Sequence, residues 1–255
     1  MTAPPENPFA ASEVGALYAR GRPYHHPRTL ARVLAHAGPA PVARGLDVAC
    51  GTGMSTRALA EIATDVVGLD VSPQMLGAVS QLANTSFVLA GAEQLPFDAQ
   101  VFDAVTCSSG VHWFDQARVY AELRRVLRPG GWVGLYDHYF FTMEGVDAFG
   151  DWVRELFARY PLPPRNPQVG DPATMMPDGF ELVADETFDD PIAMTNDEFV
   201  DYQITVSHCV AAVERGTPRD DVRAWLAAST APLFGNEPAR VFRFIASVRV
   251  LRRLP

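Results

Sequence analysis

The sequence contains no lysine, because all 21 of its basic residues are arginine. A Schiff base with a carbonyl substrate, a triphosphate-binding loop and the ATP site of a protein kinase each require a lysine ε-amine. The absence of lysine therefore excludes these three classes of chemistry.

Cysteines and long apolar runs are also scarce. The three cysteines, Cys50, Cys107 and Cys209, lack the spacing of a zinc site and are too few for a disulfide framework. No stretch of about 18 uncharged apolar residues occurs, and residues 1–11 carry prolines and Glu6 where a secretion signal has basic and then apolar residues. We therefore expect a cytoplasmic protein with no metal site and no membrane partner.

An excess of acidic residues limits the possible partners. The 30 acidic and 21 basic residues give a net charge of −9, which repels nucleic acid unless the basic residues gather on one face. The 255 residues can bury a core without a metal or a disulfide. We expect one domain over residues 1–255, a monomer or a homodimer, with a small molecule as its partner.

Short apolar runs alternate with stretches of helical periodicity from residue 45 onward, which is typical of βαβ units and a parallel sheet. The apolar runs predict strands over residues 45–50, 66–70, 86–90, 102–107, 132–136, 180–188 and 240–252. Helices are predicted over residues 11–18, 27–37, 54–62, 74–83, 116–127, 146–160, 196–213 and 218–228. Ser72 and Asp115 are the expected N-caps of two of these helices.

The alternation stops after residue 136. A predicted helix over residues 146–160 is followed by six prolines between Pro161 and Pro177, which oppose regular structure there. This segment breaks the pattern at the end of the sheet where α/β proteins bind their ligands. We therefore interpret residues 141–230 as a partly inserted substrate cap.

A glycine turn follows the first predicted strand. The segment Asp47-Val-Ala-Cys-Gly-Thr-Gly53 ends that strand and opens a helix, and its two glycines allow a ligand to approach the backbone closely. Asp70 ends the next strand, where a carboxylate can accept both hydrogen bonds of a ribose diol. The alternatives are a turn that serves packing alone and a helix-capping role for Asp70, although Ser72 already occupies the capping position.

The spacing of the turn narrows the choice of nucleotide. A dinucleotide fold requires Gly-x-Gly-x-x-Gly, and Thr56 stands in place of the third glycine. A triphosphate loop requires a lysine. What remains is a cofactor with an adenine and a ribose but no phosphate, and S-adenosylmethionine fits that description.

Five motifs in order resemble those of the class I S-adenosylmethionine-dependent methyltransferases, in their small-molecule type 11 group. They are the glycine turn, Leu69-Asp70-Val-Ser-Pro-Gln-Met75, Gly91-Ala92-Glu93-Gln-Leu-Pro-Phe97, Phe102-Asp103-Ala-Val and Leu127-Arg-Pro-Gly-Gly131. The resemblance implies an α/β fold with a Rossmann-like seven-stranded sheet, mostly parallel with an antiparallel last strand, and helices on both faces. It also implies S-adenosyl-L-methionine as methyl donor and S-adenosyl-L-homocysteine as product.

The trans-aconitate methyltransferase-like branch is the most similar, through Val111-His-Trp-Phe-Asp115 and Tyr18-Ala-Arg-Gly-Arg22-Pro23. In that branch the N-terminal segment covers the cofactor, which implies the same role for helices within residues 1–40. Two positions depart from the pattern: Ala49 replaces a glycine, and Tyr24-His-His-Pro27 lacks the usual Tyr-Pro spacing. The cofactor-binding residues that the resemblance implies are Tyr18, Arg22, Asp47, Ala49, Gly51, Gly53, Asp70, Met75, Ala92, Glu93 and Ser108.

Two histidines are the candidates for catalysis. His112 and His138 follow the fourth and fifth predicted strands, where both would open onto the cofactor cleft. Methyl transfer from a sulfonium is an in-line displacement, which needs alignment in a dry pocket rather than a metal. A carboxylate acceptor needs no base, whereas a hydroxyl gains from a histidine. A structural role is the alternative for both. His208 is expected to be a packed or surface residue, with a role in a lid as the alternative.

The expected acceptor is an oxygen atom, of a carboxylate or a hydroxyl, by analogy with the branch, while nitrogen and carbon stay open. The segment Cys107-Ser-Ser-Gly110 lacks the Asn/Asp-Pro-Pro-Tyr pattern associated with methylation of nucleobase amines. The alternative function is a methyltransferase-like protein that holds the same cofactor as an electrostatic element for an isomerisation or cyclisation, because one fold can serve different functions.

Overall fold

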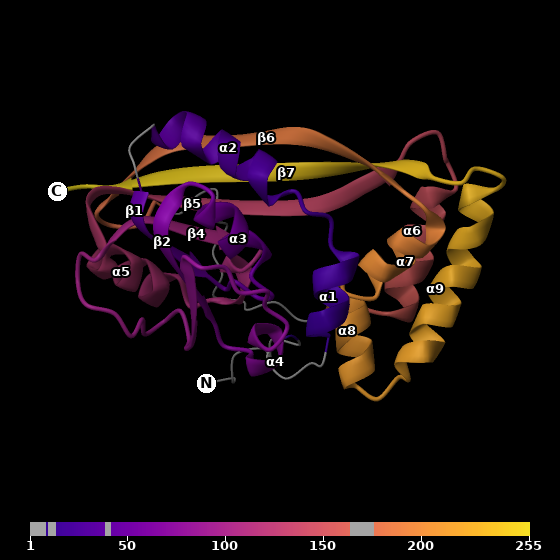
Figure 1. The fold of residues 1–255 in the computed structure, drawn as a ribbon. Helices are drawn as coiled ribbons and strands as arrows, with labels where there is room; N and C mark the ends of the chain where they lie inside the picture. The colour runs from indigo at the N-terminus through magenta and orange to yellow at the C-terminus, as the bar shows by residue number, and fades with distance from the viewer. Residues whose placement is uncertain (1–8, 10–13, 39–41, 164–175) are drawn as a thin grey trace.

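The computed structural model of the 255-residue chain describes residue 9 and residues 14–38, 42–163 and 176–255. One seven-stranded sheet runs through this part of the chain in the order β3-β2-β1-β4-β5-β7-β6 (Figure 1). Its strands are β1 (Val42–Val48), β2 (Ala63–Asp70), β3 (Thr85–Leu89), β4 (Phe102–Ser108), β5 (Leu127–Met143), β6 (Phe180–Met194) and β7 (Arg240–Arg253). Strands β1 to β5 pair in parallel, whereas β7 runs antiparallel to both β5 and β6. The predicted fold class is confirmed.

The helices of the described chain fall into two groups, one around the sheet and one beyond its end. The first group is α1 (Gly15–Gly21), α2 (His26–Ala37), α3 (Met54–Ala60), α4 (Pro73–Leu76), the short 3-10 helix η1 (Val111–Trp113) and α5 (Gln116–Val126). The second group is α6 (Phe149–Arg159), α7 (Asn196–Gln203), α8 (Ser207–Glu214) and α9 (Arg219–Phe234). None of these helices is both long and apolar enough to cross a membrane.

Alternate residues of β5 show that helices cover both faces of the sheet. Val133 and Leu135 pack in the core beneath α5, together with Leu123 of that helix. Trp132 and Tyr136 point the other way and pack in a second core with residues of α2 and α3. The period of two residues in a strand produces this division.

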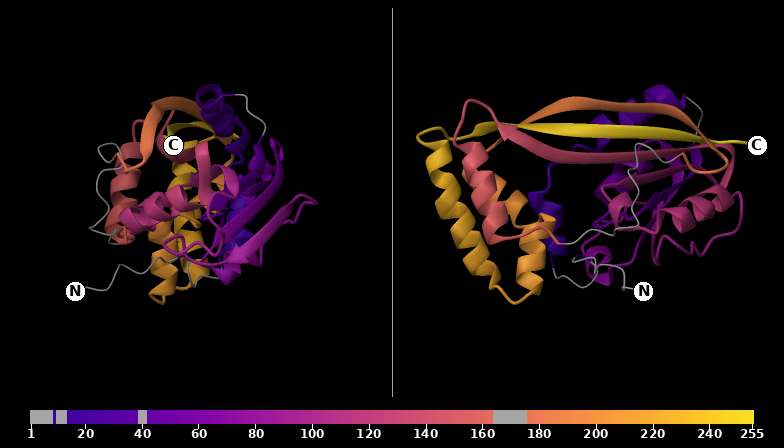
Figure 2. Two further views of the ribbon diagram at one scale, coloured as in Figure 1. Left: turned by 90° about the vertical axis from the view of Figure 1, so that its left-hand side faces the viewer. Right: turned by 180° about the vertical axis from the view of Figure 1, so that it is seen from behind.

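Three strands extend well beyond the rest of the sheet. The pairing of β5 with β7 continues to Met143 and Phe242, and the pairing of β6 with β7 continues to Met194. Helices α6 to α9 pack around this extension in a third core (Figure 2). Strands β5 and β6 are longer than the sequence predicted because the extension pairs within itself and packs against these helices, whereas β7 matches its predicted range to within one residue.

Helix α1 lies at the edge of the first group of helices, where it faces the second group, near α4 and α8 (Figure 1). The residues around it form a small core of their own, in which Val14, Leu17 and Tyr18 pack with Met75 of α4 and Val210 of α8. Helix α1 and the residue before it thus connect α4, beside the sheet, to α8 of the second group of helices.

The helix predicted over residues 74–83 is much shorter in the structure. It begins as expected, since Ser72 is the N-cap and its hydroxyl accepts the Met75 N–H. It ends at Leu76, where Gly77 follows, and the backbone freedom of glycine opposes continuation of the helix.

The helix predicted over residues 196–213 is two helices in the structure. Between α7 and α8 the Thr205 hydroxyl donates to the Tyr202 carbonyl, and Arg22 donates to the Thr205 carbonyl. Arg22 is 183 positions away in the chain, so the helical periodicity of this segment contains no signal of the break.

Candidate functional site

The turn after β1 has a backbone that few residues other than glycine adopt. Ala49, Gly51 and Gly53 have φ angles of 56°, 55° and 82°, in the left-handed region. A Cβ at Gly53 would also lie 3.3 Å from side-chain atoms of Phe87 and Val79. A ligand beyond the end of β1 can therefore approach the backbone of the turn and the N-terminus of α3 closely.

Asp70 at the end of β2 holds this turn in place. One carboxylate oxygen accepts the Gly51 N–H at 2.8 Å and the other accepts the Ser72 N–H at 2.8 Å. Burial raises the pKa of Asp70 although these backbone hydrogen bonds oppose the rise. Each carboxylate oxygen can accept a second hydrogen bond, so Asp70 can still bind two hydroxyl groups of a ligand.

A pocket of about 620 Å³, including its open mouth, lies above the turn and Asp70. Its wall combines residues from the ends of β1, β2 and β4 with residues from the N-terminal segment and η1. The predicted cofactor residues that line it are Tyr18, Ala49, Gly51, Asp70, Met75 and Ser108. The structure thus brings six of the predicted residues together from five segments of the chain.

Several residues that the sequence did not single out for the cofactor also line the pocket: Phe9, His26, Cys50, Thr52, Met54, Ser55, Ser109, Gly110 and Trp113. Cys50 and Thr52 belong to the glycine motif, and Trp113 follows His112, so position in the chain could have identified them. His26 could not be identified in this way, because tertiary packing brings it to Tyr136, whose hydroxyl lies 3.1 Å from its Nδ1.

Asp47 lies beneath the pocket and is not among the residues that line it. Its carboxylate is fully buried and accepts hydrogen bonds from Ser55, Thr56 and Thr106 at 2.6 to 2.7 Å. Burial raises its pKa to about 6, although the three hydroxyls oppose that shift. Asp47 therefore joins β1 to the start of α3 and to β4, and supports the glycine turn from below.

The other predicted residues lie around the pocket rather than on its wall. Gly53 shapes the turn, Ala92 is buried in the core beneath α5, and a Glu93 oxygen accepts the Asp115 N–H at 3.2 Å near the start of α5. Arg22 binds Thr205 between α7 and α8. His112 stacks at a tilt on Trp113, with ring centroids 4.9 Å apart.

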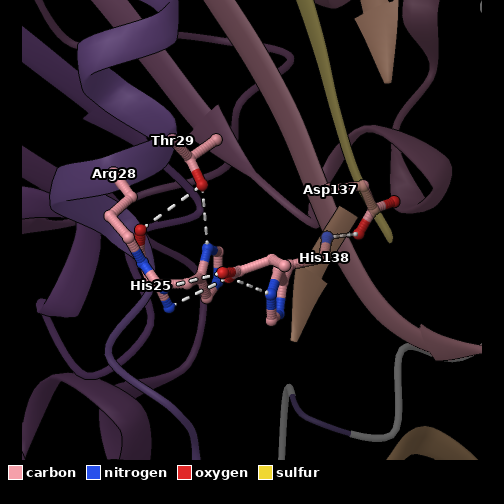
Figure 3. A network of polar contacts seen from close by, with 6 residues as sticks. His25, Arg28, Thr29, Asp137 and His138 are labelled. Atoms are coloured by element: carbon pink, nitrogen blue, oxygen red, sulfur yellow. Dashed lines mark hydrogen bonds and ion pairs between the residues drawn. The ribbon is translucent and has the colours of Figure 1, made fainter. Parts of the chain in front are cut away.

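His138 is buried in a network of polar side chains with His25 and Asp137 (Figure 3) and is not among the residues that line the pocket. Its ring is parallel to that of His25, with centroids 3.8 Å apart, and it also stacks on Phe244. The His138 Nε2 lies 2.9 Å from an oxygen of Asp190, whose carboxylate pairs with Arg28 at 2.8 Å. Burial lowers the pKa of His138, and the Asp190 hydrogen bond opposes that shift.

Comparison with known proteins agrees with the arrangement of this site. A family model described as a methyltransferase domain matches residues 46–135, which include the glycine turn and Asp70. A Mycobacterium bovis protein, described as an uncharacterised methyltransferase, is 35% identical over 231 residues, which are 88% of this chain and 87% of the relative. The chain belongs to the class I S-adenosylmethionine-dependent methyltransferase family. Membership implies S-adenosylmethionine as methyl donor.

Solved structures also resemble this methyltransferase along most of its length. A structure described as a type II methyltransferase from Anaeromyxobacter dehalogenans has a TM-score of 0.70 and 27% identity, and covers 90% of this chain and 97% of that one. The [4+2]-cyclase SpnF has a TM-score of 0.54 and 17% identity, and covers 100% of this chain and 98% of that one. The second likeness shows a shared fold alone.

No metal site is evident in the described part of this methyltransferase. Within residues 9, 14–38, 42–163 and 176–255, no group of three or more histidine, cysteine, aspartate or glutamate side chains could hold a metal ion. The polar groups at the pocket are instead backbone N–H groups, hydroxyls and the Asp70 carboxylate.

Ala49 gives a direct test of backbone strain in the glycine turn. A β-branched side chain tolerates a φ of 56° much less well than alanine. We expect Ala49→Val to lower the free energy of unfolding by about 2 kcal/mol, measured by urea titration. Ala49→Gly is the matched control and should be at least as stable as the wild type. Equal stability of the two variants would show that the turn carries no strain.

Four buried histidines predict that stability falls in acid. Burial lowers the pKa of His26 to about 3 and of His208 to about 4, and also lowers the pKa values of His25 and His138. These side chains bind protons more readily in the unfolded chain, so their contribution is complete above the unfolded pKa of about 6.5 and declines below it. Asp47, with a pKa raised to about 6, and Asp70, whose pKa burial also raises, act in the opposite direction but are two groups against four.

We therefore expect the free energy of unfolding to decrease between pH 7 and pH 5, by up to about 1.4 kcal/mol per pH unit for each net proton. Urea titrations at several pH values measure this slope. His25→Gln should reduce the slope, whereas the control His36→Gln, at a half-buried histidine paired with Glu186, should preserve it. A stability that does not change over this range would contradict the neutral state of the buried histidines.

Proposed function

We propose that this methyltransferase transfers the methyl group of S-adenosylmethionine to an oxygen atom, of a carboxylate or a hydroxyl, of a small molecule. The observation that carries the proposal is the position of Asp70, which holds the Gly51 N–H and faces the pocket with acceptor capacity to spare. A carboxylate so placed beside a left-handed glycine turn suits a ribose diol.

The residues of the pocket fit the rest of this cofactor. Met75 and Tyr18 offer apolar and aromatic surface to the adenine, while Ser108 and the glycine turn offer backbone groups to the methionine end. The Thr52 hydroxyl also lines the pocket and is buried with no hydrogen-bond partner among the described residues. A buried hydroxyl in that state is expected to pair with a ligand or with water.

The cofactor supplies an electrophilic methyl group on a sulfonium, and the protein needs to align the acceptor and exclude water. His26 is the histidine on the pocket wall, and burial lowers its pKa to about 3. Such an imidazole is a poor base near neutral pH, where catalytic bases have pKa values closer to 7. A carboxylate acceptor, which has no proton to lose, suits this pocket better than a hydroxyl.

Catalytic roles for His112 and His138 stay predictions, as does membership in the trans-aconitate methyltransferase-like branch. His112 acts on the pocket through Trp113 in this proposal. His138, paired with Asp190 and stacked on His25, orients the segment that carries His26. We also propose that residues 1–40 cover the cofactor and that residues 141–230 form the cap over the acceptor.

The test is transfer of an isotopically labelled methyl group. The full chain is incubated with methyl-labelled S-adenosylmethionine and a panel of small carboxylic acids and phenols, and mass spectrometry follows labelled product and S-adenosylhomocysteine. We expect both to form in equal amounts with at least one acid. Turnover of a substrate while the cofactor keeps its label would support the isomerisation or cyclisation alternative. Absence of any reaction in protein that binds the cofactor would contradict the proposed class of acceptor.

A further inference from the structure

Two polar side chains beside the join between α7 and α8 are buried without partners. Gln203, at the end of α7, has no exposed surface, and His208, in the first turn of α8, is 1% exposed. Neither amide atom of Gln203 and neither ring nitrogen of His208 has a hydrogen-bond partner among the described residues. Four polar atoms within six residues of chain are therefore unsatisfied.

Such groups are uncommon, because more than nine in ten buried polar groups in proteins have a partner. Leaving a group unpaired costs the full free energy of removing it from water. Gln116, the first residue of α5, is a further buried amide in this state, but its surroundings are apolar and include Val48, Val119 and Leu123. Gln203 and His208 differ from Gln116 because they flank Thr205, which Arg22 contacts, and because the charge of Arg22 acts on His208.

The positive charge belongs to Arg22, which links this segment to the cofactor pocket. Its Nε donates to the Thr205 hydroxyl at 2.9 Å and its Nη2 to the Thr205 carbonyl at 2.7 Å. The guanidinium lies over the rings of Tyr18 and Tyr202, at 4.6 and 4.9 Å. Tyr18 lines the cofactor pocket. Arg22, stacked on Tyr18, therefore links the pocket wall to the segment that carries Gln203 and His208.

Helix α8 approaches the pocket from a second direction. Val210 of this helix packs with Met75, another residue of the pocket wall. His208 lies two positions before Val210 and meets the ring of Phe157 from α6 edge-on, with centroids 5.3 Å apart. Helix α8, which carries His208, is thus packed against α6 on one side and against residues of the pocket wall on another.

The electrostatics of this position favour an anion. Burial and, to a smaller extent, the charge of Arg22 together lower the pKa of His208 to about 4. The imidazole is therefore neutral near pH 7 and offers one N–H donor, while the Gln203 amide offers two. These N–H donors are shielded from water and lie in the positive potential of Arg22. Both properties favour binding of carboxylate oxygens.

We propose that Gln203 and His208 bind a carboxylate group of the methyl acceptor, with Arg22 providing the positive potential. This inference rests on the proposed function, since it places the acceptor beside the cofactor pocket, and it narrows the acceptor to carboxylic acids. The ligand's carboxylate receives the N–H groups of both side chains and so supplies the partners that the free protein lacks.

The test uses the full chain saturated with S-adenosylhomocysteine. Benzoate, hexanoate and succinate are titrated against the chain, each beside its uncharged amide, and binding is followed by calorimetry and by the NMR resonances of the histidine rings. Loss of one resonance in His208→Phe identifies the signal of His208. We expect at least one carboxylate to bind saturably and to shift that signal, while its amide binds at least ten times more weakly.

Two variants separate ligand binding from a purely structural role. Gln203→Leu and His208→Phe remove unpaired polar groups, so both should raise the melting temperature by a few degrees. Both should also weaken carboxylate binding at least tenfold and leave the affinity for S-adenosylhomocysteine unchanged. Gln116→Leu is the matched control, which should raise the melting temperature without any change in carboxylate affinity.

The outcomes distinguish this inference from the proposed function. Normal binding of S-adenosylhomocysteine with no carboxylate binding, or with equal carboxylate affinity in wild type and both variants, overturns the carboxylate subsite and leaves the methyltransferase proposal intact. Failure of the folded wild type to bind S-adenosylhomocysteine overturns both.

Discussion

Asp70→Asn is expected to weaken S-adenosylhomocysteine binding by about 100-fold while the chain stays folded. The carboxylate holds the Gly51 N–H with one oxygen and the Ser72 N–H with the other. The amide keeps one acceptor oxygen but turns an NH2 group toward one of these donors, and it removes the charge that ribose hydroxyls would bind. Isothermal titration calorimetry measures the change in dissociation constant directly.

The matched control for this variant is Asp65→Asn, at the other end of the same strand. Asp65 is half exposed and pairs with Arg44 on the surface, and such pairs contribute little. Its substitution should leave cofactor affinity within a factor of two of the wild type. An Asp70→Asn protein that binds S-adenosylhomocysteine as tightly as the control would remove Asp70 from the cofactor site.

Asp47→Ala is expected to lower the free energy of unfolding by about 3 kcal/mol. The substitution leaves the hydroxyls of Ser55, Thr56 and Thr106 without the acceptor that all three share. It also opens a cavity at a position with no solvent exposure, so neither water nor neighbouring side chains replace the lost contacts fully. Urea titration near neutral pH measures the loss.

Asp47→Asn separates the hydrogen bonds from the volume of the side chain. The amide retains one acceptor oxygen, so a loss of about 1 to 2 kcal/mol is expected. Asp65→Ala again serves as the control and should change stability by less than about 0.5 kcal/mol. If Asp47→Ala proved as stable as this control, the three hydroxyl contacts would not support the glycine turn.

Local patterns were sufficient to predict the sheet domain and the centre of the cofactor site. The glycine turn, Asp70 and Ser72 lie within about 25 residues, and each role follows from short-range geometry: a left-handed turn, a strand end and a helix cap. The seven-stranded, mostly parallel sheet with an antiparallel last strand followed from the alternation of elements and from the family resemblance, and the structure confirms it.

Tertiary contacts decided what the sequence could not show. Arg22 contacts Thr205 across 183 positions and accompanies the break between α7 and α8, so local periodicity predicted one helix instead of two. His138 pairs with Asp190, 52 positions away, and stacks on His25, and it is not among the residues of the pocket wall. His26 reaches the pocket wall through α2 and its contact with Tyr136, 110 positions away.

The structure of the cap also depends on tertiary contacts that local sequence patterns do not reveal. Its prolines and the change of pattern after residue 136 indicated an insertion, but the long pairing of β5, β7 and β6 and the packing of α6 to α9 on it depend on the whole chain. The predicted boundary at residue 188 for the sixth strand therefore falls short of Met194. Residues 164–175, which hold three of the six prolines, lie outside the described part of the chain.

The most direct test of the central claim is calorimetric titration of S-adenosylhomocysteine into the full wild-type chain. If the pocket above Asp70 and the glycine turn is the cofactor site, one molecule binds per chain, saturably. A folded chain that shows no saturable binding at millimolar concentrations of S-adenosylhomocysteine would contradict the assignment of this pocket.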